Sequence, residues 1–238
     1  MATGMTTGDG AGVRDPRLPE RLLLAEREQF VRLLRSRATD DYFSVRTCCP
    51  GWTVRHVVAH CAAALDRVLT GRCQEEGVFS PASNDRDIAE RADWPLTRLI
   101  DELDRGFAEA GAVLADRTDG ALDAIALGEY LHSGDVREAW RVGGAYGGRS
   151  VGPALELLAH LTYVRKSPAL TAELGDRGTV RLGVHEGAGE GAGEGAGEGA
   201  AVYVGDAATL MRLYANRPLA GSRYELSGVT EAELVFFR

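Results

Sequence analysis

The segment that most constrains this chain runs from Gly51 to Cys61, with the sequence GWTVRHVVAHC. Thr53 follows a Pro-Gly pair and can act as a helix N-cap, because its hydroxyl can accept a hydrogen bond from a free backbone N–H of the first turn. Apolar residues then recur at helical spacing, and Gly71 is placed to end the helix. The segment therefore predicts a helix over residues 53–69, with His60 among the apolar positions of its inward face.

An inward-facing histidine needs a partner, either a hydrogen-bonding group or a metal ion. The candidates lie in the later segment GEYLHSGDVR, residues 128–137. Glu129 and His132 are three residues apart, so they share one face of a helix. One histidine from one helix and a Glu/His pair from another is how bundle proteins build a metal site in their core, and this set leaves a position open for catalysis. The sequence therefore predicts a divalent metal held by His60, His132 and an acidic residue, with Glu129 as the first candidate.

Helical periodicity recurs along the first two thirds of the chain. The predicted helices cover residues 16–37, 53–69, about 95–114, about 121–140 and 151–164. Four amphipathic helices of this length form a bundle, and the fifth is expected to lead into a second domain. Residues 73–93 lack a clear period and are predicted to be a loop, with at most a short helical turn at residues 87–92.

The character of the chain changes after residue 166. Short β-branched or alternating segments predict strands, and these segments are GTVRLGVH, AVYVG, RYELSG and EAELVFF. The segment DAATLMRLYANR predicts a helix between them. The sequence thus predicts an α+β chain with a disordered tail at residues 1–15, a helical bundle at 16–166 and a small α/β domain at 167–238.

A repeat of Glu, Gly and Ala occupies residues 186–200. It contains no large apolar side chain to bury, and its many glycines carry too much backbone entropy for a stable helix. It is predicted to be a flexible hairpin loop between two strands.

Composition and charge exclude several classes of partner. The chain has 238 residues, of which 45% are hydrophobic and 26% charged, as in an ordinary soluble globule. The formal net charge of −8 argues against a nucleic-acid partner, and no segment is long and apolar enough to cross a membrane. The N-terminal region has no apolar core of a signal peptide, so a cytoplasmic location is predicted.

The cysteines are expected to be reduced in that compartment. Cys48 and Cys49 are adjacent, which is poor geometry for a mutual disulfide, and no zinc-ribbon CxxC spacing exists. Cys61 is predicted to belong to the core, and none of the four cysteines has a neighbouring pattern typical of a catalytic nucleophile.

Several motifs resemble the actinobacterial mycothiol-dependent maleylpyruvate isomerase family of the DinB-like superfamily. The segment PGWTVRHVVAHC is similar to the family's histidine-bearing opening, and EYLHSGDVREAW to its His-x-x-Asp helix. The segment VGDAATLMRLYANRPLAGSRYELSG resembles the small C-terminal domain, so the resemblance covers nearly the whole chain. It implies a DinB-like four-helix bundle followed by a small α/β domain.

The resemblance also shows where this chain departs from the family pattern. The family's acidic ligand usually stands four residues before the second histidine, where this chain has Gly128, and Glu129 is one residue closer. Asp135 matches the family's His-x-x-Asp and is the alternative third ligand, or else an acceptor that orients a ligand or pairs with an arginine. His56 stands where the family has Asp and is expected at the rim of the site or on the surface.

The resemblance implies an enzyme in which the metal, expected to be zinc, holds mycothiol or a similar small thiol as a thiolate. The reaction would be isomerisation or S-transfer on a small electrophilic and anionic metabolite. Arg217, in YANRP, stands at the family's Gly-Arg pair with Asn216 in place of the glycine, and it is predicted to clamp a substrate carboxylate between the two domains. Arg212 is the competing residue, and an exposed arginine after a helix end is the alternative reading of Arg217.

Two other functions remain open from the sequence. A metal-dependent hydrolase would use the same ligands, and a binding or regulatory protein would keep the bundle without catalysis. A His/Glu ligand set accepts several divalent ions, and the sequence specifies neither the substrate nor the oligomeric state.

Overall fold

The computed structural model describes residues 14–74, 78, 80–117, 119–185 and 201–237. The chain divides into two compact units, Pro16–Pro153 and a second that contains Ala154–Arg238. Most of the predicted N-terminal tail and all of the repeat at residues 186–200 lie outside the described residues. The division falls inside a helix, and the predicted domain boundary after residue 166 stays a prediction.

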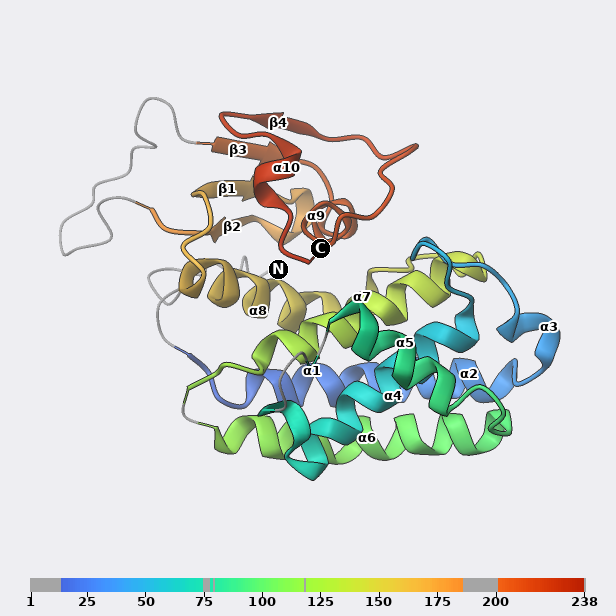
Figure 1. Cartoon of the computed structure of the whole chain (residues 1–238). Helices are drawn as coiled ribbons and strands as arrows, with labels where there is room; N and C mark the ends of the chain where they lie inside the picture. The colour runs from blue at the N-terminus through green and yellow to red at the C-terminus, as the bar shows by residue number, and fades with distance from the viewer. Residues whose placement is uncertain (1–13, 75–77, 79, 118, 186–200, 238) are drawn as a thin grey trace. The chain divides into compact units, whose positions relative to one another are not determined.

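The first unit is helical (Figure 1). Its elements are α1 (Leu18–Glu26), a π-helical turn (Arg27–Val31), α2 (Arg32–Ser36), α3 (Asp40–Phe43), α4 (Val54–Thr70), α5 (Pro81–Glu90), α6 (Leu96–Asp116) and α7 (Asp123–Ala139). Short 3-10 turns occupy Arg72–Gln74 and Gly148–Ser150, and α8 (Val151–Val164) crosses the division between the units.

Four of these helices form a bundle, as predicted. Helix α1 contacts α6 and α7, and α4 contacts the same two helices, so the four surround one core. Large apolar side chains from each helix are fully buried there, including Leu22, Leu65, Phe107 and Leu127. Burying a side chain of this size stabilises the fold by about 1.5–3 kcal/mol. This core therefore fixes the positions of α4 and α7, which carry the candidate site residues.

Helix α4 begins and ends where the sequence predicts. The Thr53 hydroxyl accepts a hydrogen bond from the backbone N–H of His56 at 3.4 Å, and the His56 ring accepts one from the backbone N–H of Thr53 at 3.5 Å. This reciprocal cap fixes the first turn, and Gly71 in the left-handed conformation ends the helix.

The prediction of a loop over residues 73–93 is wrong, because α5 lies within it. Ser80 caps α5 by accepting a hydrogen bond from the backbone N–H of Ser83. The side chains that α5 buries are polar, and Asp87 forms a buried two-pronged ion pair with Arg67 of α4. A helix that packs through an ion pair shows no apolar stripe, which explains why periodicity missed it.

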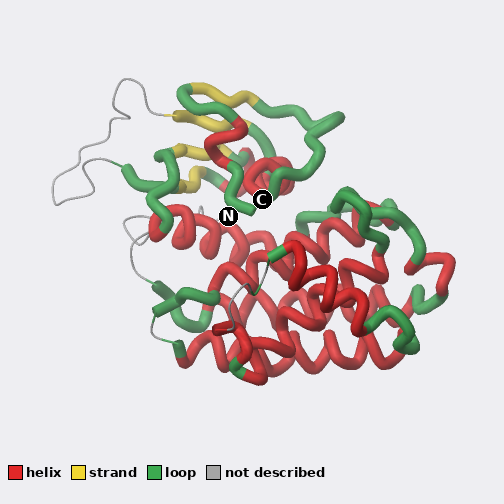
Figure 2. Tube along the Cα trace, viewed as in Figure 1, coloured by secondary structure: helices red, strands yellow, loops and turns green. Residues whose placement is uncertain are grey.

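The second unit contains a small mixed sheet. Its strands, drawn in yellow in Figure 2, are β1 (Leu170–Glu173), β2 (Thr179–Leu182), β3 (Ala201–Val204) and β4 (Glu225–Ser227). Their order in the sheet is β2-β1-β3-β4, as the labels in Figure 1 show. Strand β1 is antiparallel to β2 and parallel to β3, and β3 is antiparallel to β4. Alternate residues of β1 and β3 are buried, so one sheet face belongs to the core of this unit. The predicted α+β class is confirmed.

Three predictions for this unit need correction. Strand β1 was not predicted, and it lies between β2 and β3, so the connection that contains the repeat is not a hairpin loop. The segment EAELVFF is not a strand, because Glu231–Leu234 forms α10. A reciprocal cap between Thr230 and Glu233 starts that helix, and this polar capping signal prevails over the alternating pattern of the segment.

The predicted helix in DAATLMRLYANR is α9 (Ala207–Tyr214), capped by the Asp206 carboxylate. Its end is closed by two backbone hydrogen bonds, from Asn216 to Leu213 and from Arg217 to Arg212. Asn216 has a φ of 53°, a left-handed conformation that asparagine tolerates better than most residues. Asn216 therefore keeps the backbone turn that a glycine would make before Arg217.

Among the described residues, no helix combines the length and the apolar character needed to cross a bilayer.

Candidate metal centre

Helices α4 and α7 bring two predicted ligands together. The ring centroids of His60 and His132 are 5.2 Å apart, with their planes at 81°. Two imidazoles bound through nitrogen to one tetrahedral zinc ion have centroids roughly 5 Å apart, given Zn–N bonds of about 2.0–2.1 Å. The spacing of these two rings therefore fits a shared ion.

Trp52 packs against both imidazoles, with ring centroids 5.1 Å from His60 and 6.1 Å from His132. It is placed by a turn in which its backbone N–H donates to the carbonyl of Cys49. Pro50 and Gly51 occupy the central positions of this turn, and Gly51 supplies the φ of 79° that its second central position requires. The Pro-Gly pair thus sets the indole beside the two histidines.

His60 is held in the neutral form that a metal ligand needs. Burial, and after it the nearby His132 and Arg67, lower its pKa to about 3. Its Nδ1 atom is buried and has no hydrogen-bond partner among the described residues. A buried imidazole nitrogen in this condition fits a role as a metal ligand better than a role in packing alone.

Asp135 orients the second histidine. His132 Nδ1 lies 3.0 Å from Asp135 Oδ2, and the Asp135 side chain is fully buried. A carboxylate on one ring nitrogen fixes the tautomer and presents the other nitrogen, here Nε2, to an ion. The sequence left Asp135 as either a third metal ligand or an acceptor that orients one. This contact corresponds to the second role.

Glu129 is buried at the α4–α7 interface and hydrogen-bonded to the thiol of Cys61, the residue that follows His60. Burial raises the pKa of Glu129 and outweighs the lowering by the Cys61 contact, so that the pKa is about 8. One carboxylate oxygen, Oε2, is buried without a hydrogen-bond partner in the described part of the chain. Cys61 itself is fully buried, as predicted for a core residue.

The predicted ligands do not all converge on one point. In the described residues, the group of three metal-binding side chains whose ligand atoms all lie within 4.8 Å of one another is Cys48, Cys49 and Asp135. His60, His132 and Glu129 do not form such a group. The two imidazoles fit an ion as they stand, whereas Glu129 faces Cys61 and has to turn toward them to bind it.

Tyr146 completes the surroundings of Asp135. Its hydroxyl donates to Asp135 Oδ1 at 2.7 Å, and burial together with the nearby carboxylate raises its pKa. The ring of Tyr146 lies directly over α7 at Gly134, where an added Cβ would come within 2.2 Å of the ring. Gly134 therefore permits the close approach that lets Tyr146 reach the carboxylate.

His56 does not point to this centre. Its ring accepts a hydrogen bond from the backbone N–H of Thr53 and so caps α4. An aspartate at this position could accept the same hydrogen bond. Burial and the nearby Arg46 lower its pKa, which keeps the ring neutral and able to accept the hydrogen bond.

Arg217 and Arg212 have different surroundings in the second unit. Arg212 donates to Ser222 at 3.1 Å and to the carbonyl of Pro218, so it ties down the segment after α9. Arg217 donates to the carbonyl of Ala215 at 3.1 Å and lines a cavity of about 670 Å³.

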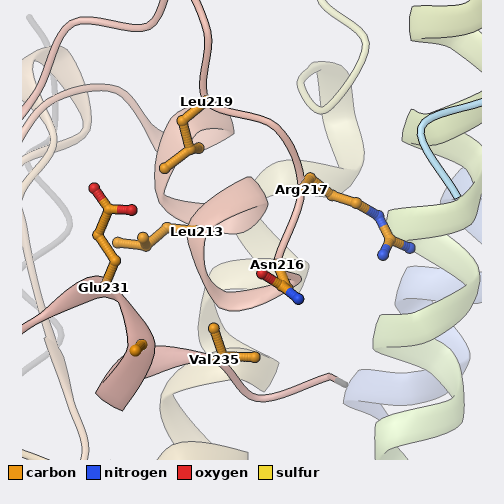
Figure 3. A pocket seen from close by; sticks show the side chains of 7 residues that line it. Leu213, Asn216, Arg217, Leu219, Glu231 and Val235 are labelled. Carbon is orange, nitrogen blue, oxygen red and sulfur yellow. The ribbon is translucent and has the colours of Figure 1, made fainter. Parts of the chain in front are cut away.

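Figure 3 shows that the Arg217 side chain extends away from Leu213 and Glu231, which line the same cavity. Both arginines are half-buried, and of the two it is Arg217 that lines the cavity.

Sequence reasoning missed three contributors to the centre, namely Trp52, Tyr146 and the pair Cys48-Cys49. In the sequence-based prediction, the cysteine pair is considered only for disulfide geometry and CxxC spacing. Its place just before the Pro-Gly turn and the histidine helix was the available signal. Tyr146 lies beyond the end of α7, and no local pattern connects it to Asp135.

Comparisons with known proteins bear on the same region. Residues 23–149, more than half of the chain, match the family model described as the mycothiol maleylpyruvate isomerase N-terminal domain. Two solved structures are similar, the mycothiol-dependent maleylpyruvate isomerase at a TM-score of 0.46 and a histidine-to-alanine variant of it at 0.48. Each is 18% identical, with 90% of this chain and 94% of the other covered. A search of curated proteins found no significant match.

Proposed function

We propose a function from the premise that this chain belongs to the family of the mycothiol maleylpyruvate isomerase N-terminal domain. The chain is an enzyme that uses mycothiol, or a similar small thiol, in an isomerisation or S-transfer on a small electrophilic metabolite. A divalent ion, with zinc as the first candidate, is bound in the bundle. The observation that carries this proposal is the pairing of the His60 and His132 rings at 5.2 Å within the matched region.

The side chains around the two rings support a metal centre. His60 is neutral at physiological pH because its pKa is about 3, so protons do not compete for its nitrogens. Asp135 holds His132 Nδ1 and leaves Nε2 to face an ion. An ion in this position would keep the thiol of the cosubstrate deprotonated and nucleophilic.

We assign the acidic ligand to Glu129 before Asp135. Glu129 Oε2 is a buried oxygen without a partner among the described residues, and a pKa of about 8 marks a carboxylate that burial disfavours as an anion. A neighbouring cation relieves that cost, because an opposite charge favours the ionised form. Asp135 already accepts hydrogen bonds from His132 and Tyr146 and serves to hold the ring.

Arg217 is proposed to bind a carboxylate or similar oxyanion of the substrate. It lines a cavity, and a guanidinium offers the planar two-pronged geometry that matches a carboxylate. The residues proposed around the ion are histidines and acids, so a positive group has to come from elsewhere to hold an anionic substrate. An anionic electrophile is therefore the proposed substrate class.

A mycothiol-dependent assay with maleylpyruvate and a panel of electrophilic acids tests the proposal. We expect turnover that requires mycothiol and that a chelator abolishes. Arg217→Ala should reduce activity on the order of 100-fold, and Arg217→Lys should recover little, because a point charge does not replace the planar fork.

The matched control is Arg223→Ala, which removes an exposed arginine from the same unit. It should leave activity close to that of the wild type, and metal content should be unchanged in all three variants. Activity that is independent of thiol and metal, or equal losses in Arg217→Ala and Arg223→Ala, would contradict the proposal.

A further inference from the structure

A second cluster of metal-binding groups lies beside the histidine centre and joins Asp135 to two cysteines that the function proposed above does not use. Cys48 and Cys49 precede the Pro-Gly turn, and Asp135 comes from α7. Cys48 Sγ is 3.1 Å from Asp135 Oδ1, and Cys49 Sγ is 3.2 Å from Asp135 Oδ2. The cluster thus joins two adjacent thiols to both oxygens of one buried carboxylate.

The spacing within the cluster is close to that of a coordination sphere. All three ligand atoms lie within 4.8 Å of one another. In tetrahedral zinc sites, bonds of about 2.3 Å to sulfur and 2.0–2.2 Å to oxygen place neighbouring ligand atoms roughly 3.6–3.8 Å apart. The sulfur–oxygen pairs would have to separate by only about half an ångström to admit an ion.

The access and the surroundings also suit a bound ion. Cys49 and Asp135 are buried and Cys48 is half-buried, so the cluster is reached from the Cys48 side. Tyr146 donates to Asp135 and lies 3.9 Å from Cys48 Sγ. His132 Nδ1 lies 3.9 Å from Cys49 Sγ, so the cluster adjoins the ring that Asp135 holds.

We propose that Cys48, Cys49 and Asp135 form a second divalent-metal site, distinct from the histidine pair and selective for a thiophilic ion such as Zn²⁺ or Cd²⁺. Two thiolates favour soft and borderline ions over Mg²⁺ and Ca²⁺, which prefer oxygen ligands. A carboxylate has about four acceptor positions, so Asp135 can bind this ion and still hold His132. An ion here would lie directly behind the residue that orients His132 and would tune its basicity.

Titration of metal-free, reduced protein with Co²⁺ tests this site, because cobalt bound to thiolate gives charge-transfer absorption that cobalt bound to histidine lacks. We expect that absorption to saturate in the wild type and to persist in His60→Ala, which disables the histidine pair. It should disappear in Cys48→Ser/Cys49→Ser, with the cobalt affinity of the site lower by about 100-fold or more. Cys48→Ser alone changes a half-buried side chain and guards against misfolding of the double variant.

Cys73→Ser is the matched control, because Cys73 is a buried cysteine outside the cluster. It should keep the absorption. Absence of the band in the wild type, its survival in Cys48→Ser/Cys49→Ser, or its loss in Cys73→Ser would overturn the site. Loss of the band in His60→Ala would show that one ion is shared, which overturns a separate second site. If only the histidine pair fails to bind metal, the cobalt that binds without a charge-transfer band would be lost. The thiolate band would then stay intact.

Discussion

The two carboxylates of α7 near the centre differ in what surrounds them. Asp135 accepts hydrogen bonds from His132, Tyr146 and the thiols of the cysteine pair, so its charge is distributed over several donors. Glu129 is equally buried but hydrogen-bonded to one thiol, and burial dominates its pKa. We therefore propose that a carboxylate orients His132 at one position and binds the cation at the other.

This difference predicts a pH-dependent effect of Glu129→Gln in the metal-free protein. The pKa of Glu129 rises from its ordinary 4.5 to about 8 in the folded chain, so stability is fully present below pH 4.5 and is lost as pH rises toward 8. The loss amounts to about 1.4 kcal/mol per pH unit while only the folded state holds the proton. Glutamine has no proton to lose, so the variant should gain stability over the wild type between pH 5 and pH 8.

Urea unfolding in the presence of a chelator at these two pH values measures the effect. Glu109→Gln, which changes an exposed glutamate of α6, is the control and should show no such gain. A difference between Glu129→Gln and the wild type that does not vary with pH would contradict the account. With metal present, the same variant should bind the ion more weakly, because it lacks the proposed acidic ligand.

At the scale of elements, α7 carries both the centre and its anchor to α1. Arg137 Nη2 donates to Glu26 Oε2 at 2.6 Å, with 8% and 1% of the two side chains exposed. Arg137 also lies over the Phe30 ring. This ion pair ties α7 to α1 close to Asp135, the residue that contacts His132.

Removing one partner of this buried pair should be costly. Arg137→Ala is expected to lower the free energy of unfolding by about 3–5 kcal/mol, because it leaves the Glu26 carboxylate buried and unpaired. The double variant Glu26→Gln/Arg137→Met should lose much less, since no charge stays buried. Equal losses in the single and double variants, measured by denaturant unfolding, would show that packing rather than charge decides the effect.

The sequence predicted the elements that follow a simple period or a capping signal. The five long helices, the cap at Thr53 and the pairing of the helices that carry His60 and His132 follow from apolar spacing and order along the chain. Helix α5 was missed because it packs through Asp87 and Ser83, and β1 because it is only four residues long. Periodicity reports burial of apolar side chains and is blind to elements fixed by polar contacts.

For the site, the sequence predicted only which types of residue lie together on one face of a helix. Three contacts could not be predicted, because they depend on side-chain directions and on a turn distant in sequence. Glu129 contacts Cys61, Asp135 contacts His132, and Cys48 and Cys49 also contact Asp135. Gly128 stands where the family has its acidic ligand. It shows that this chain differs from the family pattern but not which residue replaces that ligand.

At the scale of the whole molecule, the repeat at residues 186–200 joins β2 to β3, which flank β1. Strands two places apart in a sheet are separated by about 10 Å, which about five residues can span. Deleting most of the repeat should therefore change the melting temperature by less than about 2 °C and leave activity intact. A fall of more than about 5 °C, on the order of 1–2.5 kcal/mol for a chain of this length, would show that the repeat packs against the folded chain.

The central claim is that one divalent ion is shared by His60 and His132. Diffraction from crystals of zinc-loaded protein, collected on both sides of the zinc absorption edge, locates the ion directly. We expect an anomalous peak about 2.0–2.1 Å from one nitrogen of each imidazole. Zinc-loaded crystals without a peak between these two rings, whether or not one appears at Cys48 and Cys49, would contradict it.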